Sequence, residues 1–222
     1  MAQYQVVEKF VSINGEGRRA GELAVFIRFK GCNLSCSYCD TKWANELNAE
    51  AEWMTEYEIL EYIRDSGVKN VTLTGGEPLY REDMKVLLDV LLNESSLRVE
   101  IETNGSIDLS AYQREQENLS FTMDYKLPDS GMEQNMYAEN FACLTDRDTV
   151  KFVVGSQEDL LCAAKIMEQY QLPGRVAVYL SPVFGKIHPE AIVAFMIKNH
   201  LNDVKVQLQL HKFIWKPDQR GV

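Results

Sequence analysis

A chain of 222 residues with a formal net charge of −10 has the size of one globular domain, so residues 1–222 are expected to form a single domain. Hydrophobic residues make up 45% and charged residues 25% of the chain, which excludes the disordered and fibrous classes. The acidic balance argues against nucleic acid as the main partner, because neutralising phosphates requires clustered lysine and arginine. The sequence has no apolar run long enough to cross a membrane and no secretory signal pattern at its start. We therefore expect a cytoplasmic protein with a small-molecule ligand and no membrane partner.

Short apolar, β-branched runs alternate with helical patterns along the chain. Strands are expected at residues 24–29, 71–74, 98–102, 121–125, 149–154, 175–180 and 204–210. Four helices are expected. The first begins at Thr55, which can form a capping box with Glu58, and ends at Gly67. The second carries the apolar face of Met84, Leu87, Leu88 and Leu91, the third follows Ser156, and the fourth begins at Pro189. Residues 127–148 are expected to be an irregular loop, and the charged run 114–117 a solvated face.

Strands that alternate with helices predict an α/β fold with a largely parallel sheet. The six or seven units fall short of the eight in a complete barrel, so we expect an incomplete TIM-like βα barrel. An open doubly wound sheet is the alternative. Both folds bind ligands at the carboxyl ends of their strands, where the least ordinary loops of this sequence are expected to lie.

Three cysteines, Cys32, Cys36 and Cys39, lie within eight residues at the spacing C-x3-C-x2-C. A [4Fe–4S] cluster normally takes four cysteines, so three would leave one iron open for another ligand. A zinc site completed by Cys143, Cys162 or a histidine is one alternative, and three free thiols are another. A non-catalytic iron–sulfur electron carrier would normally supply all four ligands.

The cysteine triplet, with Tyr38 just before the last cysteine, resembles the radical S-adenosylmethionine enzymes. The sequence Gly75-Gly76-Glu77-Pro78 follows a predicted strand, as the glycine motif of that superfamily does. The resemblance implies a [4Fe–4S] cluster that binds S-adenosylmethionine and produces a radical that abstracts hydrogen. It also implies that Tyr38, Gly76 and Glu77 lie at the S-adenosylmethionine site.

Three further blocks narrow the resemblance: residues 12–17 (SINGEG), Cys39-Asp40-Thr41, and His211-Lys212-Phe213 near the end of the chain. With the short length, they resemble the 7-carboxy-7-deazaguanine synthase family over nearly the whole chain. That family converts 6-carboxy-5,6,7,8-tetrahydropterin to 7-carboxy-7-deazaguanine with loss of ammonia, on the route to queuosine and related deazapurines. The alternative is a glycyl-radical-enzyme activase, which shares the cluster spacing and acts on a protein backbone.

The synthase resemblance also assigns roles by position. It implies that Thr41 binds Mg²⁺, and that a reductase such as flavodoxin or ferredoxin supplies electrons to a homodimer. Further contacts to S-adenosylmethionine would come from Asp124, Tyr125, Lys126 and Ser181. The pterin substrate would be bound by Ile13, Asn14, Gly15, Arg28, Thr74 and the terminal carboxylate of Val222.

Two positions depart from the family pattern. Asn14 stands where the family commonly has glutamine, and Asp124-Tyr125-Lys126 replaces a common Ser-Pro-Lys. For two other residues a purely structural role is also possible. Arg28 could form an ion pair with Glu100 or Glu102, and His211 could either contact the ligand or only stabilise the fold.

Overall fold

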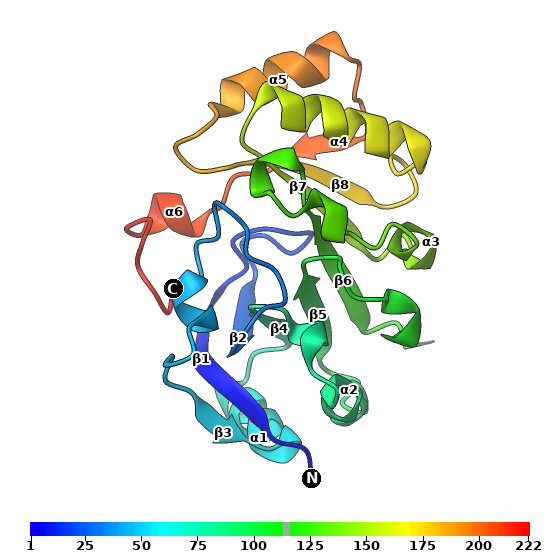
Figure 1. The fold of residues 1–222 in the computed structure, drawn as a ribbon. Coiled ribbons are helices and arrows are strands. Elements are labelled where there is room, and N and C mark those ends of the chain that lie inside the picture. The colour runs from blue at the N-terminus through cyan, green and yellow to red at the C-terminus, as the bar shows by residue number, and fades with distance from the viewer. Residues whose placement is uncertain (113–115) are drawn as a thin grey trace.

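The computed structural model describes residues 1–112 and 116–222, so residues 114 and 115 of the predicted charged face lie outside the described residues. Nine strands form one curved sheet with helices packed along its outer side (Figure 1). The strands are β1 (Tyr4–Ile13), β2 (Leu23–Phe29), β3 (Glu52–Met54), β4 (Asn70–Gly75), β5 (Arg98–Thr103), β6 (Leu119–Tyr125), β7 (Thr149–Val154), β8 (Ala177–Pro182) and β9 (Val204–Val206). The α-helices are α1 (Glu56–Ser66), α2 (Met84–Leu92), α3 (Asn140–Cys143), α4 (Gln157–Gln169), α5 (Pro189–Lys198) and α6 (His211–Ile214).

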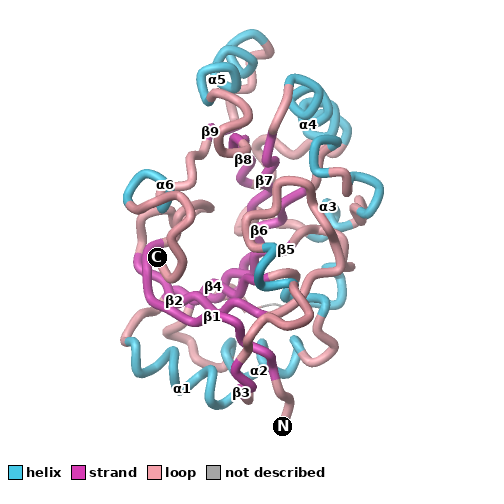
Figure 2. Tube along the Cα trace, turned by 60° about the vertical axis from the view of Figure 1, so that its left-hand side comes forward, coloured by secondary structure: helices cyan, strands magenta, loops and turns pink. Residues whose placement is uncertain are grey.

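The strand order identifies the fold as an incomplete TIM-like barrel, as predicted. The order is β3-β1-β2-β4-β5-β6-β7-β8-β9, and all pairs from β2 to β9 are parallel. A doubly wound sheet would reverse its order at a switch point, whereas these parallel strands follow one another in chain order. The sheet curves around an interior but ends at β3 and β9, so the barrel is not closed (Figure 2).

The first and third strands were not predicted. β1 pairs antiparallel with both β2 and β3, and so extends the sheet beyond the parallel units. Its residues mix charged and apolar side chains with a register shift between Val6 and Glu8, which obscures the alternation typical of a strand. At the other edge, β9 ends at Val206 instead of residue 210, because Gln207 and Gln209 turn to contacts described below. The predicted loop 127–148 contains α3 and two short 3₁₀ helices.

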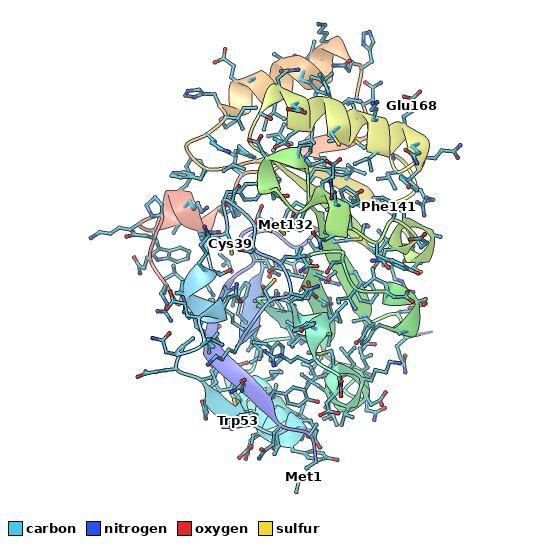
Figure 3. The ribbon with its side chains drawn as sticks, in the orientation of Figure 1. Met1, Cys39, Trp53, Met132, Phe141 and Glu168 are labelled. Carbon is cyan, nitrogen blue, oxygen red and sulfur yellow. The ribbon has the colours of Figure 1, made fainter. Side chains whose placement is uncertain are left out.

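The two faces of the parallel strands carry different chemistry. Val25, Leu73 and Ile101 face the helices and are fully buried, forming the hydrophobic core. The alternate positions, such as Thr74 and Glu102, face the barrel interior, where they hydrogen-bond to one another. Much of the barrel interior is therefore polar and charged. Figure 3 shows the side chains over the whole ribbon, with Cys39 near the centre of the view.

Helix ends follow the predicted signals and fix the lengths of the βα units. Thr55 accepts a hydrogen bond from the Glu58 N–H while Glu58 accepts one from the Thr55 N–H, completing the capping box of α1. Gly67 ends that helix in the left-handed conformation, and Ser156 caps α4 through the Asp159 N–H. In the described part of the chain, no helix is long and apolar enough to span a membrane.

Candidate active site

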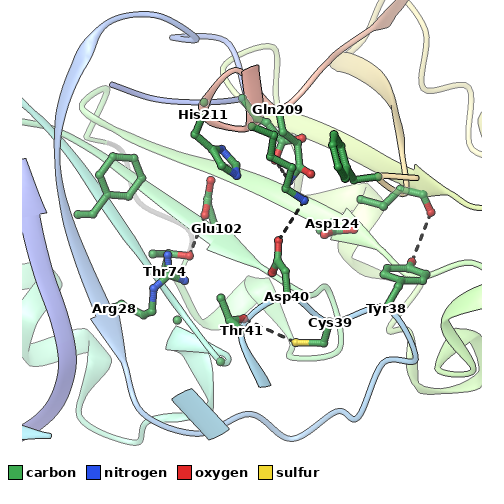
Figure 4. Close-up of a pocket in the computed structure, with 18 of the residues that line it drawn as sticks. Arg28, Tyr38, Cys39, Asp40, Thr41, Thr74, Glu102, Asp124, Gln209 and His211 are labelled. Carbon is green, nitrogen blue, oxygen red and sulfur yellow. Dashed lines mark hydrogen bonds and ion pairs between the residues drawn. The ribbon is translucent and has the colours of Figure 1, made fainter. Parts of the chain in front are cut away.

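A cavity of about 600 Å³ opens at the carboxyl ends of the parallel strands. Side chains from the cysteine loop, the sheet and the C-terminal segment face it (Figure 4). Of the residues predicted at the site, thirteen line this cavity: Ile13, Gly15, Arg28, Cys32, Cys36, Tyr38, Cys39, Thr41, Thr74, Gly76, Asp124, Lys126 and Val222. Four do not line it: Asn14, Glu77, Tyr125 and Ser181.

The cysteine loop enters the cavity directly after β2. Cys36 is buried, and Cys32 and Cys39 are half-buried. Cys32 Sγ accepts hydrogen bonds from the Leu34 N–H at 3.4 Å and from the Asn104 side chain at 3.6 Å. Burial raises the pKa of the Cys32 and Cys36 thiols, so binding iron at these positions would release protons.

Gly75 and Gly76 allow the end of β4 to approach the end of β2 and the start of the cysteine loop closely. The Gly76 N–H donates to the Phe29 carbonyl, and the Glu77 N–H to the Gly31 carbonyl, at 3.2 and 3.0 Å. A Cβ at Gly76 would lie 1.9 Å from the Gly31 carbonyl oxygen, so only glycine fits there. The glycine motif therefore fixes the point where the cysteine loop leaves the sheet.

Glu77 ties the ends of two neighbouring strands together. Its carboxylate accepts hydrogen bonds from the Leu79 N–H, the Thr103 hydroxyl and the Asn104 N–H. Burial raises its pKa to about 7, against the opposing effect of these donors. Because Asn104 donates to Cys32, Glu77 positions the residue that contacts the first thiol.

The donor groups of the cavity fit an iron–sulfur cluster and S-adenosylmethionine. Three thiols line one wall, and Cys143 and Cys162 are not among the lining residues, so they provide no fourth ligand for zinc. Among the described residues, no three histidine, cysteine or acidic side chains converge on one metal ion; in a cluster each thiolate binds a different iron. Asn45 Oδ1 and Asp124 Oδ1 are buried without a hydrogen-bond partner in the described chain, so they can accept from the amino or hydroxyl groups of a ligand.

A chain of charges crosses the barrel interior. Asp124 Oδ2 lies 2.9 Å from Lys126 Nζ and 3.7 Å from Lys151 Nζ, and Lys151 Nζ lies 3.2 Å from Glu16 Oε2. Burial would lower the pKa of both lysines, but the facing carboxylates raise it above the usual value, so both stay cationic. Asp124, the acidic residue in place of the serine of the common Ser-Pro-Lys, is thus the counter-ion of both Lys126 and Lys151.

The loop between β1 and β2 bridges the open side of the barrel. Gly17 exchanges two hydrogen bonds with the Gln207 side chain, and the Leu210 N–H donates to the Gly15 carbonyl. Glu16 accepts hydrogen bonds from Gln209 and Ser181 in addition to Lys151. The open side of the barrel, between the edge strands of the sheet, is therefore closed at one end by loop contacts instead of strand pairing.

Arg28 and Thr74 face the same part of the cavity from neighbouring strands (Figure 4). Arg28 Nε lies 3.0 Å from Glu8 Oε2, so its ion-pair partner is neither Glu100 nor Glu102, the structural alternative that the sequence left open. Glu102 instead accepts a hydrogen bond of 2.7 Å from Thr74 Oγ1. The antiparallel β1, absent from the predicted elements, supplies the partner of Arg28.

The predicted residues outside the cavity lining have other contacts. Asn14 is buried and accepts a hydrogen bond from Thr72, while its Nδ2 has no partner among the described residues. The Tyr125 ring packs between Phe141 and Phe152 on the outer side of the sheet, so a ligand could meet only its backbone. Ser181 donates to Glu16.

Two loop residues and His211 complete the cavity wall. Thr41 Oγ1 lies 3.6 Å from Cys39 Sγ, beside the cysteine loop (Figure 4). Tyr38 donates to the Val153 carbonyl across the cavity at 3.3 Å. His211 lines the cavity against Gly15, where a Cβ would lie 2.8 Å from its Nδ1, and burial lowers its pKa.

The sequence assigned no role to Lys151, Gln207 or Asn104, although the turn that contains Asn104 was expected at the ligand-binding ends of the strands. The charged Lys151 within the apolar strand 149–154 was an available signal, because an unpaired lysine is rarely buried. Gln207 lies 190 residues from its partner Gly17, and local sequence carries no signal for such a contact.

Comparison with known proteins identifies the family. The radical SAM superfamily matches residues 26–123. A 7-carboxy-7-deazaguanine synthase of Clostridium acetobutylicum is 58% identical over 219 residues, which cover 99% of each chain. The chain belongs to the 7-carboxy-7-deazaguanine synthase family.

A second relative agrees with this assignment, and a solved structure shares the fold. The 7-carboxy-7-deazaguanine synthase of Chlorobaculum tepidum is 34% identical over all of this chain and 98% of that protein. The crystal structure of QueE from Escherichia coli shares the fold, with a TM-score of 0.74 and 22% identity over 93% of this chain and 94% of that one. This member of the synthase family is a radical S-adenosylmethionine enzyme, which implies a [4Fe–4S] cluster and S-adenosylmethionine as cofactors.

Proposed function

We propose that this enzyme converts 6-carboxy-5,6,7,8-tetrahydropterin to 7-carboxy-7-deazaguanine and ammonia. The observation that carries the proposal is the 58% identity to a synthase of that name over nearly the full length of both chains. The cavity adds support, since it brings the three cysteines together with Arg28 and Thr74, the residues proposed to contact the pterin. The glycyl-radical activase alternative has no such relative among the similar proteins described above.

Cys32, Cys36 and Cys39 would hold the cluster, and Tyr38, Gly76, Asp124 and Lys126 would contact S-adenosylmethionine together with the backbone of Tyr125. Glu77 and Ser181 would act indirectly, by holding Asn104 and Glu16. When bound, the cluster and S-adenosylmethionine supply one-electron chemistry and hydrogen abstraction. The protein's part is to orient the substrate and exclude water.

Arg28 would bind the substrate carboxylate, because a guanidinium matches a carboxylate with paired donors. Ile13, Gly15, Thr74 and Val222 would contact the pterin ring. Asn14 lies outside the cavity lining, so it would act indirectly, by holding the loop 13–17 through its hydrogen bond from Thr72. The ion pair between Lys151 and Glu16 would keep the loop 13–17 against the ring. Residues 1–222 would act as one domain, since all nine strands share one sheet.

Thr41 would bind Mg²⁺, a hard cation that prefers oxygen ligands and uses few of them from the protein. Its hydroxyl faces the cavity between the cysteine loop and Arg28, where a cation could meet the substrate carboxylate. Thr41→Ala should weaken the Mg²⁺ dependence of turnover and leave the iron content unchanged. An unchanged Mg²⁺ response would remove Thr41 from the metal site.

We further propose a homodimer that receives electrons from a flavodoxin or ferredoxin, as the family resemblance implies. A cytoplasmic location fits five free cysteines, because reduced thiols are maintained in that compartment.

The direct test is an anaerobic incubation of the iron–sulfur-reconstituted enzyme with S-adenosylmethionine, Mg²⁺, a reductant and 6-carboxytetrahydropterin. Mass spectrometry should detect 7-carboxy-7-deazaguanine. Formation of 5′-deoxyadenosine alone would retain the radical chemistry and reject the substrate. Neither product, despite a reducible cluster, would reject both.

A further inference from the structure

The C-terminal segment, residues 216–222, forms one wall of the cavity without joining the sheet. Residues 217–222 all line the cavity. The backbone hydrogen bond from Gln219 N–H to the Lys216 carbonyl is internal to the segment, and within the described chain no backbone bond links the segment to a strand. Its position must therefore depend on side chains.

Arg220 supplies the side-chain attachment. Its guanidinium carbon lies 3.4 Å from the centre of the Trp43 ring, and its Nε lies 3.6 Å from Glu8 Oε1. Trp43 belongs to the short 3₁₀ helix Lys42–Asn45, directly after the cysteine loop. The C-terminus lies beside this light-blue helix in Figure 1. Arg220 thus joins the C-terminal segment to both the cysteine loop and β1.

Glu8 connects this attachment to Arg28. Its Oε2 faces Arg28 Nε at 3.0 Å while its Oε1 faces Arg220, so one carboxylate lies between two guanidinium groups. The Glu8 and Arg28 side chains are only 14% and 16% exposed, so loss of either one would leave a poorly hydrated charge on the other. The group of three carries one net positive charge at the cavity, which suits a ligand with a carboxylate.

We propose that Arg220 and Trp43 form a clamp that positions residues 216–222 as a wall of the substrate cavity and, through Glu8, fixes Arg28. The substrate in this inference rests on the proposed function. Arg220 is a positioning residue: removing it should weaken substrate binding and leave the cluster and S-adenosylmethionine in place.

The clamp can be tested without substrate or cofactors. In a Trp53→Phe/Trp215→Phe background, Trp43 is the only tryptophan, and acrylamide quenching of its fluorescence reports how well it is covered. Arg220→Ala should raise the quenching constant about twofold, because the stacked guanidinium covers the ring. Arg98→Ala is the matched control, since Arg98 is equally exposed and pairs with Glu22 away from the cavity. Equal quenching in all three proteins would overturn the clamp.

Turnover then tests the positioning role. Arg220→Ala should raise KM for 6-carboxytetrahydropterin about tenfold, the combined scale of a cation–π contact and an ion pair, with KM for S-adenosylmethionine unchanged. Trp43→Phe keeps a ring for stacking and should stay near wild type. Trp43→Ala should raise KM for the pterin by less than Arg220→Ala does, because the ion pair between Arg220 and Glu8 remains. The double alanine variant should be no worse than Arg220→Ala. Additive effects, or an unchanged KM, would contradict the clamp. If the wild-type enzyme made no product, the proposed function would fail while the quenching result still decided the clamp.

Discussion

At the residue scale, two buried glutamates show how the barrel interior handles charge. Glu77 accepts three hydrogen bonds at the ends of β4 and β5, whereas Glu100 accepts one from the Thr122 hydroxyl deeper in the barrel. Burial raises the pKa of Glu100 to about 6. Neither carboxylate has a lysine or arginine within ion-pair distance in the described chain, so each retains its proton to a higher pH than in water.

Glu100 should make stability depend on pH. Its pKa is raised from 4.5 to about 6, so between these values the folded state binds more protons than the unfolded state, and stability falls as pH rises. Glu100→Gln removes this titration and keeps an oxygen acceptor for Thr122. The unfolding free energy of wild type relative to Glu100→Gln should therefore fall by about 2 kcal/mol from about pH 4.5 to about pH 7.

Urea unfolding of the two cluster-free proteins at both pH values measures this difference. A constant difference across the window would mean that Glu100 titrates normally in the folded protein.

The pair Lys151–Glu16 gives a second prediction at this scale. Glu16→Ala leaves the buried Lys151 with Asp124 as its one remaining ion-pair partner among the described residues, which should cost about 2–3 kcal/mol of unfolding free energy. Lys151→Met in addition removes the unpaired charge, so the double variant should recover part of that loss. Denaturant unfolding of the four proteins gives the coupling energy; simple additivity would show that the pair does not hold the loop.

At the element scale, the cysteine loop depends on the glycines that end β4. Gly76 contacts the backbone of Gly31 so closely that no side chain fits, whereas Gly67, the left-handed cap of α1, has open space around its Cβ position. An alanine at Gly76 would therefore report the free-energy cost of a steric clash, and an alanine at Gly67 the cost of a left-handed backbone conformation.

Gly76→Ala should displace the cysteine loop, because the new methyl group meets a carbonyl rather than a movable side chain. We expect a loss of at least about 3 kcal/mol of unfolding free energy together with loss of cluster assembly, read by iron content and visible absorption. Gly67→Ala should cost only about 1 kcal/mol and retain the cluster. Normal iron content in Gly76→Ala would contradict the packing role of the motif.

The sequence predicted those elements whose signals lie within a few neighbouring residues. The strand at 24–29, the helix capped by Thr55 and the cysteine loop all have local patterns, and the structure contains them. β1 was missed because its apolar face is interrupted by charges whose partners lie on other strands. The link between Glu16 and Lys151 spans 135 residues and arises only when the sheet curves. Thirteen of the predicted site residues line one cavity, because they were placed by resemblance at strand ends that the fold brings together.

At the scale of the whole molecule, the incomplete barrel explains how a small chain encloses a large cavity. The parallel strands place the cysteine loop, the glycine motif and Asp124 at one rim. The missing strands leave a side opening, which the loop 14–17 and the C-terminal segment cover with side-chain contacts.

In the proposed reaction, the residues of this cavity hold the pterin while radical chemistry contracts its ring. The product equals the substrate minus one ammonia, so the overall reaction consumes no electrons and S-adenosylmethionine can be regenerated. The decisive measurement is therefore the stoichiometry of one anaerobic turnover mixture, in which 7-carboxy-7-deazaguanine, ammonia and 5′-deoxyadenosine are quantified together. Wild type should form the first two in equal amounts with far less 5′-deoxyadenosine, Cys143→Ala should match it, and Cys32→Ala should form none. Accumulation of 5′-deoxyadenosine without ammonia or the deazaguanine, or turnover by Cys32→Ala, would contradict this reaction.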